Sequence, residues 1–397
     1  MHSSRRIGPP RKGPFRPLGP GFSRLATALA ALALVALVIL APWRDWLGSP
    51  SAPPPQPSRT RYPDIPRIDV HVHVPPDRAE EAVALFERHH VRLALNASGG
   101  HPGRGLEASA DAAGRTDGRL RPYCNLSFGR VESPGFADYV RNALDECVAQ
   151  GAVGLKVFKS LGLGVELSDG SLLRVDDPRV DPVFEGAAAR DLPILIHAGD
   201  PRAFFEPPTP DNERYDELQA HPGWSFHGDR ADGRPWPSWE EVFAQYRARV
   251  ARHPDATFLG AHFGNAPEEP DRVAAMLEAH PSYVVETGAR IPEIGRHDPE
   301  RMRALFMRYQ DRILFGTDLQ MGSHGLVLGS AGSEPDPPSR IPRFYRAHWR
   351  YFETADRGFA HPTPIQGDWT IDGLNLPRKV LEKLYWRNAA RVFSLSP

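Results

Sequence analysis

Cysteine is almost absent from this chain. Only Cys124 and Cys147 occur in 397 residues, so the sequence has neither the disulfide framework of a small secreted domain nor the ligands of a Cys-rich zinc site. Any metal site must therefore use histidine, aspartate or glutamate. The two cysteines are compatible with a disulfide in an oxidising compartment, but we predict two separate buried thiols.

An excess of charge of either sign is absent as well. Lysine and arginine number 48 and aspartate and glutamate 49, which gives a net charge of -1 and no indication of nucleic-acid binding. With 41% hydrophobic residues, the chain can bury a large core. We therefore expect a globular enzyme rather than a nucleic-acid partner.

Acidic residues are missing from residues 1–24, which carry several arginines, and an uncharged, mostly apolar run follows at 25–43. At about 1.5 Å per residue this run spans roughly 29 Å, close to the hydrocarbon thickness of a bilayer. The basic flank predicts a cytoplasmic tail over 1–24, a transmembrane anchor over 25–43, and a single-pass protein whose catalytic domain is periplasmic or otherwise extracytoplasmic. A signal peptide cleaved near Ser49–Ala52 is the alternative, and a buried soluble helix is a further one.

Proline is concentrated between this segment and the rest of the chain. Residues 44–66 contain Pro50, Pro53, Pro54, Pro55, Pro57, Pro63 and Pro66. Such a segment forms neither helix nor sheet, so we expect a stiff linker. The catalytic domain is then residues 67–397.

From residue 67 onward, short apolar strands alternate with amphipathic or alanine-rich helical stretches. The predicted strands are Ile68–Val74, Val91–Asn96, Arg121–Phe128, Val153–Lys159, Pro193–His197, Thr257–His262, Tyr283–Thr287 and Ile313–Gly316. Predicted helices lie between them, except that the connection between the second and third strands lacks a clear helix, and the last helix covers Pro377–Leu395. The pattern predicts an α/β fold, a (β/α)8 TIM barrel with insertions after strands five and eight.

Residues Ile68–Val74 alternate apolar and polar side chains. In a regular strand Asp69, His71 and His73 lie on one face, with the apolar side chains on the other. Two neutral imidazoles at this spacing can reach one divalent metal. The alternative is a half-exposed strand with incidental histidines.

Polar residues stand at the ends of five further predicted strands. They are Lys159 after the fourth, His197 after the fifth, His262 after the sixth, Glu286 and Arg290 after the seventh, and Asp318 after the eighth. The carboxyl ends of barrel strands form one face, which carries the active site, so we expect these side chains to meet there. A structural role at a strand end is the alternative for each residue alone.

Together, the Asp-x-His-x-His of strand one, the histidines ending strands five and six, Gly316-Thr317-Asp318 and the closing segment Trp386–Phe393 resemble the amidohydrolase superfamily. The similarity covers about residues 67–395 and is closest to the amidohydrolase-related branch, which includes hydrolases and decarboxylases such as aminocarboxymuconate semialdehyde decarboxylase. It implies that His71, His73, His197 and Asp318 hold a divalent metal, with one zinc ion expected. It also implies that His262 and Asp318 are catalytic.

In that reading the metal lowers the pKa of a bound water from 15.7 to about 7, and the resulting hydroxide attacks a carbonyl carbon. His262 poises the water and helps to stabilise the oxyanion, Asp318 passes the proton to the leaving group, and Asp69 orients a ligand.

The resemblance leaves the number of metals open. In binuclear members of the superfamily a carbamylated lysine at the end of strand four bridges two metals, and Lys159, or Lys156 on the opposite face, stands there. We expect one metal and an electrostatic role for Lys159 in binding substrate. A lysine paired with a carboxylate at the rim is the alternative.

Two insertions are expected to cover the mouth, at 199–238 and 319–376. Arg202, Arg290 and Lys159 supply positive charge, which favours a small carboxylated or cyclic organic substrate. The predicted function is hydrolysis of an amide, ester or lactone. Non-oxidative decarboxylation at the same site is the alternative, and a membrane-tethered binding protein without chemistry is the third possibility.

Overall fold

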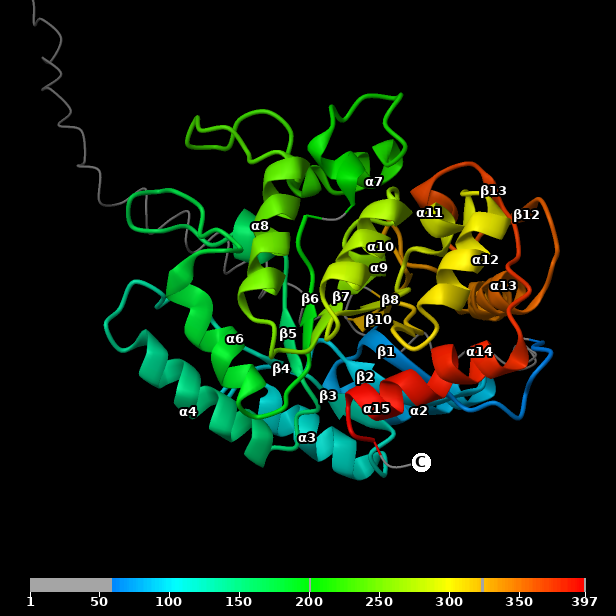
Figure 1. Ribbon diagram of the computed structural model, residues 1–397, viewed down its shortest axis with the longest axis horizontal. Coiled ribbons are helices and arrows are strands. Elements are labelled where there is room, and N and C mark those ends of the chain that lie inside the picture. Colours follow the sequence, from blue (N-terminus) through cyan, green and yellow to red (C-terminus); the bar gives the residue numbers. More distant parts are fainter. Residues whose placement is uncertain (1–58, 200, 323–324, 396–397) are drawn as a thin grey trace, which may run out of the picture. The chain divides into compact units, whose positions relative to one another are not determined.

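The computed structural model describes residues 59–199, 201–322 and 325–395, all within the unit Pro53–Pro397. Short strands form a barrel in the middle of this unit, and helices surround them (Figure 1). The barrel strands are β1 (Arg67–His73), β2 (Val91–Asn96), β3 (Leu120–Pro122) with β4 (Cys124–Asn125), β5 (Leu155–Val157), β6 (Ile194–Ile196), β7 (Phe258–Gly260), β8 (Val284–Glu286), and β9 (Ile313–Leu314) with β10 (Leu319–Gly322).

Strand pairing closes the barrel in sequence order. Neighbouring barrel strands are parallel throughout, and β10 pairs with β1 through Val72–Leu319 and His73–Gln320. The third strand is divided at Tyr123, whose backbone N–H still donates to Asn96 O at 3.0 Å. The eighth strand is divided between β9 and β10. The pairing confirms the predicted (β/α)8 barrel.

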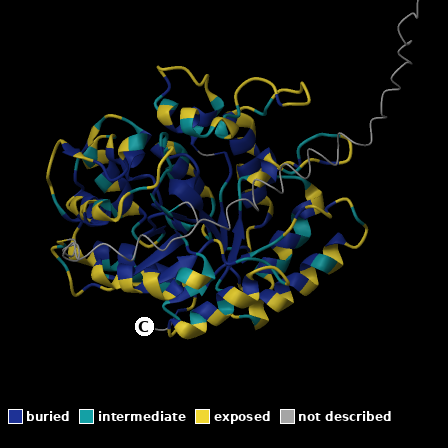
Figure 2. Ribbon diagram, turned by 180° about the vertical axis from the view of Figure 1, so that it is seen from behind, coloured by how far each residue is buried: buried dark blue, intermediate teal, exposed yellow. Residues whose placement is uncertain are grey.

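Helices connect the strands and cover the outside of the barrel. The α-helices that lie between barrel strands and outside the insertions are α2 (Ala79–Arg88), α3 (Leu106–Arg115), α4 (Phe136–Ala149), α5 (Ser160–Leu163), α6 (Asp181–Ala188), α8 (Trp239–Arg252), α9 (Ala261–Gly264), α10 (Pro270–Ala279), α11 (Ile291–Gly295) and α12 (Pro299–Arg308). Short 3-10 segments lie at Pro76–Arg78 and Pro178–Val180. Figure 2 shows buried strands in the centre and helices whose outer faces are exposed.

The prediction that no clear helix links the second and third strands is wrong. Helix α3 occupies this connection and buries Leu106, Ser109 and Ala112. Its only large apolar residue is Leu106, so the helical periodicity of hydrophobic residues is weak in the sequence. The predicted C-terminal helix is observed as α14 (Arg378–Glu382), a π-helical segment at Lys383–Arg387 and α15 (Asn388–Val392).

Both predicted insertions are present and contain regular structure. The first includes 3-10 segments at Arg202–Phe205 and Pro222–Trp224 and helix α7 (Tyr215–Ala220). The second includes β10, β11 (Gly325–Leu328), α13 (Ile341–Glu353), β12 (Phe359–Ala360), β13 (Thr370–Ile371) and 3-10 segments at Pro338–Arg340 and Pro364–Gln366.

A buried ion pair joins the second insertion to the start of the barrel. Arg67 of β1 donates to Glu353 of α13 at 3.1 Å, and both side chains are at most 1% exposed. The rings of Trp349 and Tyr385 lie 4.3 and 4.5 Å from the guanidinium carbon. Breaking such a pair leaves a buried charge uncompensated, so α13 is firmly tied to β1.

Two buried clusters show that β1 changes face part-way along its length. Ile68 and Val70 pack with the inward-facing Leu195 and Leu259, whereas Val72 packs in the layer between strands and helices. The change occurs at a β-bulge: Asp69 pairs with Ala94 and Val72 pairs with Asn96, so β1 has one more residue than β2 between these two pairs. The bulge lets both Val70 and His71 point inward.

The two cysteines form a disulfide, so the prediction of two separate thiols is wrong. Cys124 lies on β4 and Cys147 on α4, with their Cα atoms 5.7 Å apart. This separation is typical of disulfides. The sequence allows this pairing but does not favour it over two thiols, because the contact depends on how α4 packs against the third strand.

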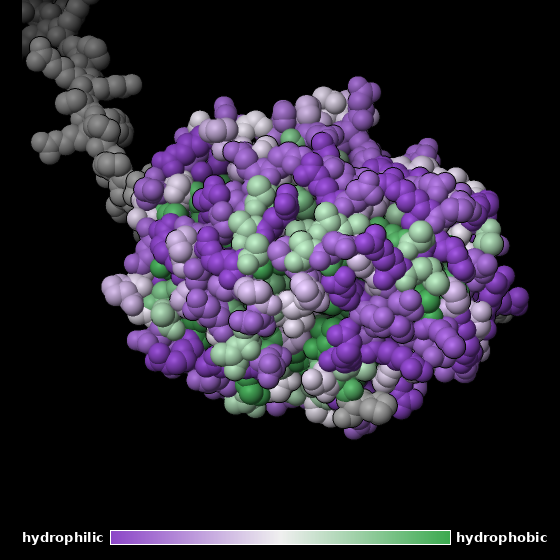
Figure 3. All heavy atoms as spheres, in the orientation of Figure 1, coloured by the Kyte–Doolittle hydropathy of each residue, from purple (hydrophilic) through white to green (hydrophobic). Residues whose placement is uncertain are grey.

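Side chains on the face shown in Figure 3 are mostly hydrophilic, and apolar ones form small scattered groups. Within the described ranges, no helix has the length and apolar character needed to cross a bilayer. The predicted tail over 1–24, the anchor over 25–43 and most of the linker lie outside the described residues.

Candidate metal centre and cavity

His71 and His73 extend from the end of β1 into the mouth of the barrel. His73 Nε2 lies 3.2 Å from Asp318 Oδ1, and His71 Nε2 lies 3.6 Å from the same oxygen. On the far side of its ring, His73 Nδ1 contacts Ser98 Oγ at 2.6 Å. The structure thus brings three predicted metal ligands to one point.

Asp318 belongs to the turn that follows β9, and Asp69 holds this turn in place. Asp318 has a φ of 56°, in the left-handed region that is rare for residues other than glycine. The Asp69 carboxylate accepts hydrogen bonds from Thr317 N at 3.0 Å, Thr317 Oγ1 at 2.5 Å and His71 N at 3.2 Å. These bonds help to fix both His71 and the residue before Asp318.

Asp69 does not share a face with His71 and His73, so that part of the strand prediction is wrong. The bulge in β1 turns Asp69 toward α13, where burial and, second to it, the Asp69 charge raise the pKa of Tyr345. Burial also raises the pKa of Asp69 itself, to about 7. Asp69 therefore acts through the backbone of the site and not from inside the cavity.

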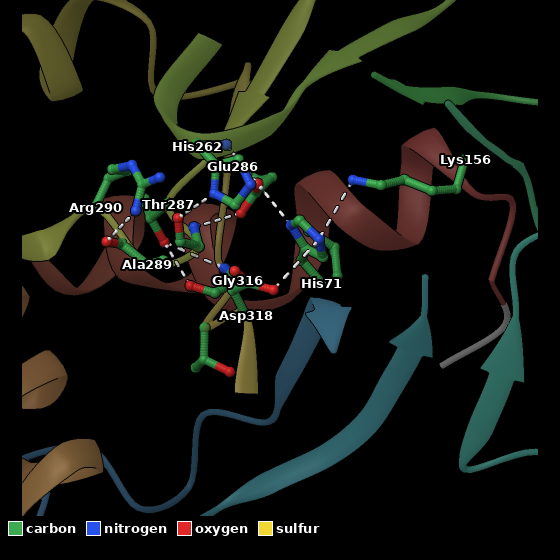
Figure 4. A network of polar contacts seen from close by, with 12 residues as sticks. His71, Lys156, His262, Glu286, Thr287, Ala289, Arg290, Gly316 and Asp318 are labelled. Atoms are coloured by element: carbon green, nitrogen blue, oxygen red, sulfur yellow. Dashed lines mark hydrogen bonds and ion pairs between the residues drawn. The ribbon is translucent and has the colours of Figure 1, made fainter. Parts of the chain in front are cut away.

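Glu286, at the end of β8, orients His71. Its Oε1 accepts hydrogen bonds from His71 Nδ1 at 3.0 Å and from the backbone N–H of His262 at 2.7 Å, and its Oε2 accepts one from Gly288 N. Burial raises the pKa of Glu286, but each of its oxygens accepts a backbone N–H, which favours the carboxylate form. Because a carboxylate only accepts, the proton of His71 is placed on Nδ1 and Nε2 keeps its lone pair. Figure 4 shows Glu286 between His262 and His71. A Cβ on Gly316 would collide with Glu286 Oε2, which explains the glycine there.

His262 and His197 lie side by side at the mouth. His262 follows β7 with a φ of 55°, and its Nδ1 donates to Gly288 O at 2.9 Å. Its ring centre is 4.3 Å from that of His197 and 5.1 Å from that of His71. His197 lines the cavity but is outside the two groups of described residues whose ligand atoms converge within 4.8 Å.

The two lysines of the fourth strand have different positions. Lys156, not Lys159, is buried beside the histidines, with Nζ 3.4 Å from His71 Nε2 (Figure 4). Burial lowers its pKa to about 8. Lys159 lies farther along, where its ammonium is 5.0 Å from the ring centre of Phe204 and 5.9 Å from that of Trp224.

Electrostatics favour neutral imidazoles at this site. Burial lowers the pKa of His71 and of His262 well below the ordinary histidine value. Burial would raise the pKa of Asp318, but the neighbouring His71 and His73 outweigh this and lower it. Neutral imidazole nitrogens and an ionised carboxylate are the donors that a divalent metal requires.

Two groups of side chains converge closely enough to bind a metal: His71, His73 and Asp318, and His71, His262 and Glu286. In the group with His262 and Glu286, the Glu286 oxygens already accept three N–H bonds. We therefore assign this group the task of orienting His71, which also belongs to the group with His73 and Asp318. In the first, Asp318 Oδ1 lies 3.2 and 3.6 Å from the two nitrogens. Tetrahedral donors about 2.1 Å from zinc are about 3.4 Å apart, so the spacing fits.

A cavity of about 250 Å³ opens above this group. Its described lining includes Lys156, Lys159, Arg214, Arg290, Asp318, the three rings of Phe158, Phe204 and Trp224, and Gln320 and Ser330. Among the predicted substrate-binding residues, Lys159 and Arg290 line the cavity. Arg202 does not, and instead pairs with Glu269.

Three residues of the site are not among the predicted site residues. Glu286 was recognised only as a strand-end residue, and its bonds to two other strands cannot be inferred from one chain segment. Lys156 was left as the alternative to Lys159, because the length of the strand decides which lysine points inward. Arg214 lies in an insertion without a motif.

Comparisons with known proteins give one family match and several similar solved structures. A family described as amidohydrolase matches residues 68–395. Solved structures similar to this chain include 2,6-dihydroxybenzoate decarboxylase from Rhizobium, at 15% identity and a TM-score of 0.47, and a putative amidohydrolase from Staphylococcus aureus, at 14% and 0.49. Another is a probable 2-pyrone-4,6-dicarboxylic acid hydrolase from Acinetobacter baumannii, at 10% and 0.44. Each match covers 83% of this chain and 99% of the other. No curated protein matches the sequence.

Proposed function

The chain belongs to the amidohydrolase family, as its strand motifs predicted, and from this and its site we propose that it is a metal-dependent hydrolase. The proposed substrate is an amide, ester or lactone of a small organic molecule. The convergence of His71, His73 and Asp318 at the barrel mouth carries the proposal, with His197 beside them. A divalent ion held there, one zinc in our proposal, would supply Lewis acidity and a more acidic water.

The surrounding residues suit this chemistry. Since His262 donates through Nδ1 to Gly288 O, its Nε2 is an acceptor and can hold an attacking water by one of its hydrogens. In this tautomer His262 cannot donate to an oxyanion, so we assign that part to the Lys156 ammonium. Asp318, with its lowered pKa, is ionised and can take the water's proton and pass it to the leaving group.

The experiment is a product assay with purified full-length protein, with and without added zinc. A panel of small aryl esters, anilides and lactones is followed by pH-stat titration and by carbon dioxide detection. We expect acid release without carbon dioxide, abolished by chelation and by His71→Ala/His73→Ala, while the exposed-loop control His227→Ala retains activity. Turnover that survives both chelation and the double substitution would refute the proposal.

A second candidate is non-oxidative decarboxylation at the same site. The cationic lining by Lys156, Lys159, Arg214 and Arg290 favours a carboxylate substrate, which this reaction requires. Release of carbon dioxide in proportion to substrate consumed, without net hydrolysis, would select it.

We also propose that residues 25–43 anchor the protein in a membrane with the barrel on the extracytoplasmic side. The apolar run supports this, and so does the Cys124–Cys147 disulfide, since such bonds are rare in reducing compartments. Fractionation with protease treatment of spheroplasts tests it: we expect a membrane-bound barrel accessible to protease. A barrel that is protected inside the cell would overturn the proposal, and a mature N-terminus beyond Ala52 would favour a cleaved signal peptide.

A further inference from the structure

The turn after β7 carries His262 in an unusual backbone conformation. Four successive residues have positive φ values: His262 (55°), Phe263 (55°), Gly264 (73°) and Asn265 (61°). The left-handed conformation costs a residue other than glycine roughly 1–2 kcal/mol. It persists only where surrounding contacts impose it. The contacts that hold this turn therefore also determine where the His262 imidazole lies.

Asn265, at the end of this turn, is tied to β6 through its side chain. The residue is fully buried. Its Oδ1 accepts a hydrogen bond from Ala198 N at 2.7 Å, and its Nδ2 donates to Ile196 O at 3.3 Å. Within the turn itself, Asn265 N donates to Ala261 O at 2.8 Å. One side chain thus connects the turn after β7 to the end of β6.

The two side-chain bonds of Asn265 lie on either side of His197. The last backbone pair between β6 and β7 is Ile196 with Gly260, after which the chain enters the left-handed turn. The Asn265 carboxamide has an acceptor and a donor, so it takes the place of the next peptide group in the ladder. From the opposite strand, Val157 O of β5 accepts from His197 N at 3.0 Å. The backbone at His197 is therefore held from both neighbouring strands.

Two buried tyrosines pack against the glycines of the same turn. The hydroxyl of Tyr246 donates to that of Tyr283 at 2.8 Å. A Cβ on Gly260 or on Gly264 would collide with the Tyr283 hydroxyl, so this packing requires glycine at both positions. The turn is thus packed closely against the tyrosines and tied to β6 by the Asn265 carboxamide.

The two imidazoles held by this arrangement lie next to each other. The ring centres of His197 and His262 are 4.3 Å apart, and both rings line the cavity. His262 precedes Asn265 by three residues in one turn, and His197 lies between the two residues that the carboxamide binds. Loss of the carboxamide bonds would therefore change the separation of the two rings.

We propose that Asn265 is a positioning residue whose carboxamide sets the separation of the His197 and His262 imidazoles. Through this separation it holds His197 within reach of the metal-binding group, while His262 stays placed for the attacking water. This effect on the metal centre rests on the proposed function, whereas the control of the ring separation does not. Asn265 is not part of the described cavity lining, so it acts through the two histidines and not by contact with substrate.

The ring separation is tested in the metal-free full-length protein with isotope-labelled histidine. A nuclear Overhauser cross-peak between the ring protons of His197 and His262 reports it, with assignments from His197→Gln and His262→Gln. We expect the cross-peak in the wild type and its loss in Asn265→Gly, because glycine keeps the left-handed turn without steric cost and removes both side-chain bonds. Asn265→Asp, ionised at alkaline pH, keeps the acceptor for Ala198 N but lacks the donor to Ile196 O, and should weaken the cross-peak.

Asn388→Ala is the matched control. Asn388 is also buried, and its Nδ2 donates to two backbone oxygens, Gln310 O and Ile313 O, both at 2.8 Å. Ile313 begins β9, so these bonds lie at the end of the barrel opposite the mouth. This variant should lose stability, as Asn265→Gly does, and keep the wild-type cross-peak.

Control of the ring separation by Asn265 is overturned if the metal-free wild type shows no cross-peak. It is also overturned if folded Asn265→Gly keeps the cross-peak at wild-type intensity. Circular dichroism verifies folding, and if Asn265→Gly does not fold, Asn265→Asp at alkaline pH decides by the same criterion.

Cobalt binding tests the effect on the metal centre without a need for turnover. We expect Asn265→Gly to bind cobalt about tenfold more weakly than the wild type and to shift its visible absorption bands, whereas Asn388→Ala matches the wild type. Wild-type affinity and spectrum in an Asn265→Gly protein that has lost the cross-peak would overturn this effect. If the wild type binds no cobalt, the metal centre itself fails and the effect with it, while the cross-peak still decides the control of the ring separation.

Discussion

Glu286→Gln separates the orientation of His71 from the ligands themselves. In the wild type the carboxylate accepts three hydrogen bonds, from His71 Nδ1, His262 N and Gly288 N. Glutamine has the same shape but one acceptor atom, so its NH2 group must face at least one of these donors. Wherever it faces, a buried N–H group loses its acceptor.

The expected magnitude follows from that lost acceptor. If the NH2 group faces His71, Nδ1 must become the acceptor and the proton moves to Nε2, the atom that faces Asp318. If it faces Gly288, the turn after β8 loses its bond. Changes to residues that orient a ligand typically weaken metal binding 10–100-fold, which is about 1.4–2.7 kcal/mol.

The assay is competition for zinc with a chromophoric chelator at pH 7.5. We expect Glu286→Gln to weaken zinc binding within that range, while the exposed control Glu278→Gln, which removes a surface pair with Arg308, does not. Circular dichroism verifies that both variants are folded. A folded Glu286→Gln with wild-type zinc affinity would refute the reasoning.

Three further predictions concern stability. Cys124→Ser/Cys147→Ser removes a disulfide with a sequence separation of 23, and should lower the free energy of unfolding by about 3 kcal/mol in a urea titration. Adding reductant to the wild type should cause the same loss. Equal stability of variant and wild type would contradict the disulfide. Glu353→Gln leaves the buried Arg67 without its ion pair, and a thermal melt should show a loss of roughly 3–5 kcal/mol, whereas a change under 1 kcal/mol would argue against the pair. Burial lowers the pKa of His348 to about 4, because the folded protein disfavours the charged imidazole. The resulting contribution to the free energy of unfolding is fully present above pH 6.5 and is lost, by up to about 3 kcal/mol, as the pH falls toward 4. His348→Gln should flatten that part of the stability curve, and an unchanged slope would exclude this cause.

The barrel could be predicted from the hydrophobic pattern, because each of its strands and most of its helices are formed by one short, continuous stretch of sequence. Each apolar run becomes one barrel strand, and the order of strands in parallel barrels is fixed by right-handed crossovers. The histidines of strand one and Asp318 were found for the same reason: strand ends meet at one face. Helix α3 was missed because its alanine-rich sequence has little apolar periodicity.

Other features depend on pairing between distant segments. The bulge in β1 is defined only against β2, so strict alternation placed Asp69 on the wrong face. The identity of the inward lysine depends on where β5 ends, and the disulfide depends on the packing of α4. Arg214 is held by Glu293, which is remote in sequence, and no local pattern predicts that contact.

The most direct test of the metal centre is the metal content per chain, measured by elemental analysis of the purified full-length protein and of His71→Ala/His73→Ala. We predict about one zinc or similar divalent ion per chain in the wild type, lost in the double variant. Two ions per chain would place Lys156 in the ligand shell of a binuclear site. No bound metal in the wild type, even after reconstitution, would contradict the centre formed by His71, His73 and Asp318.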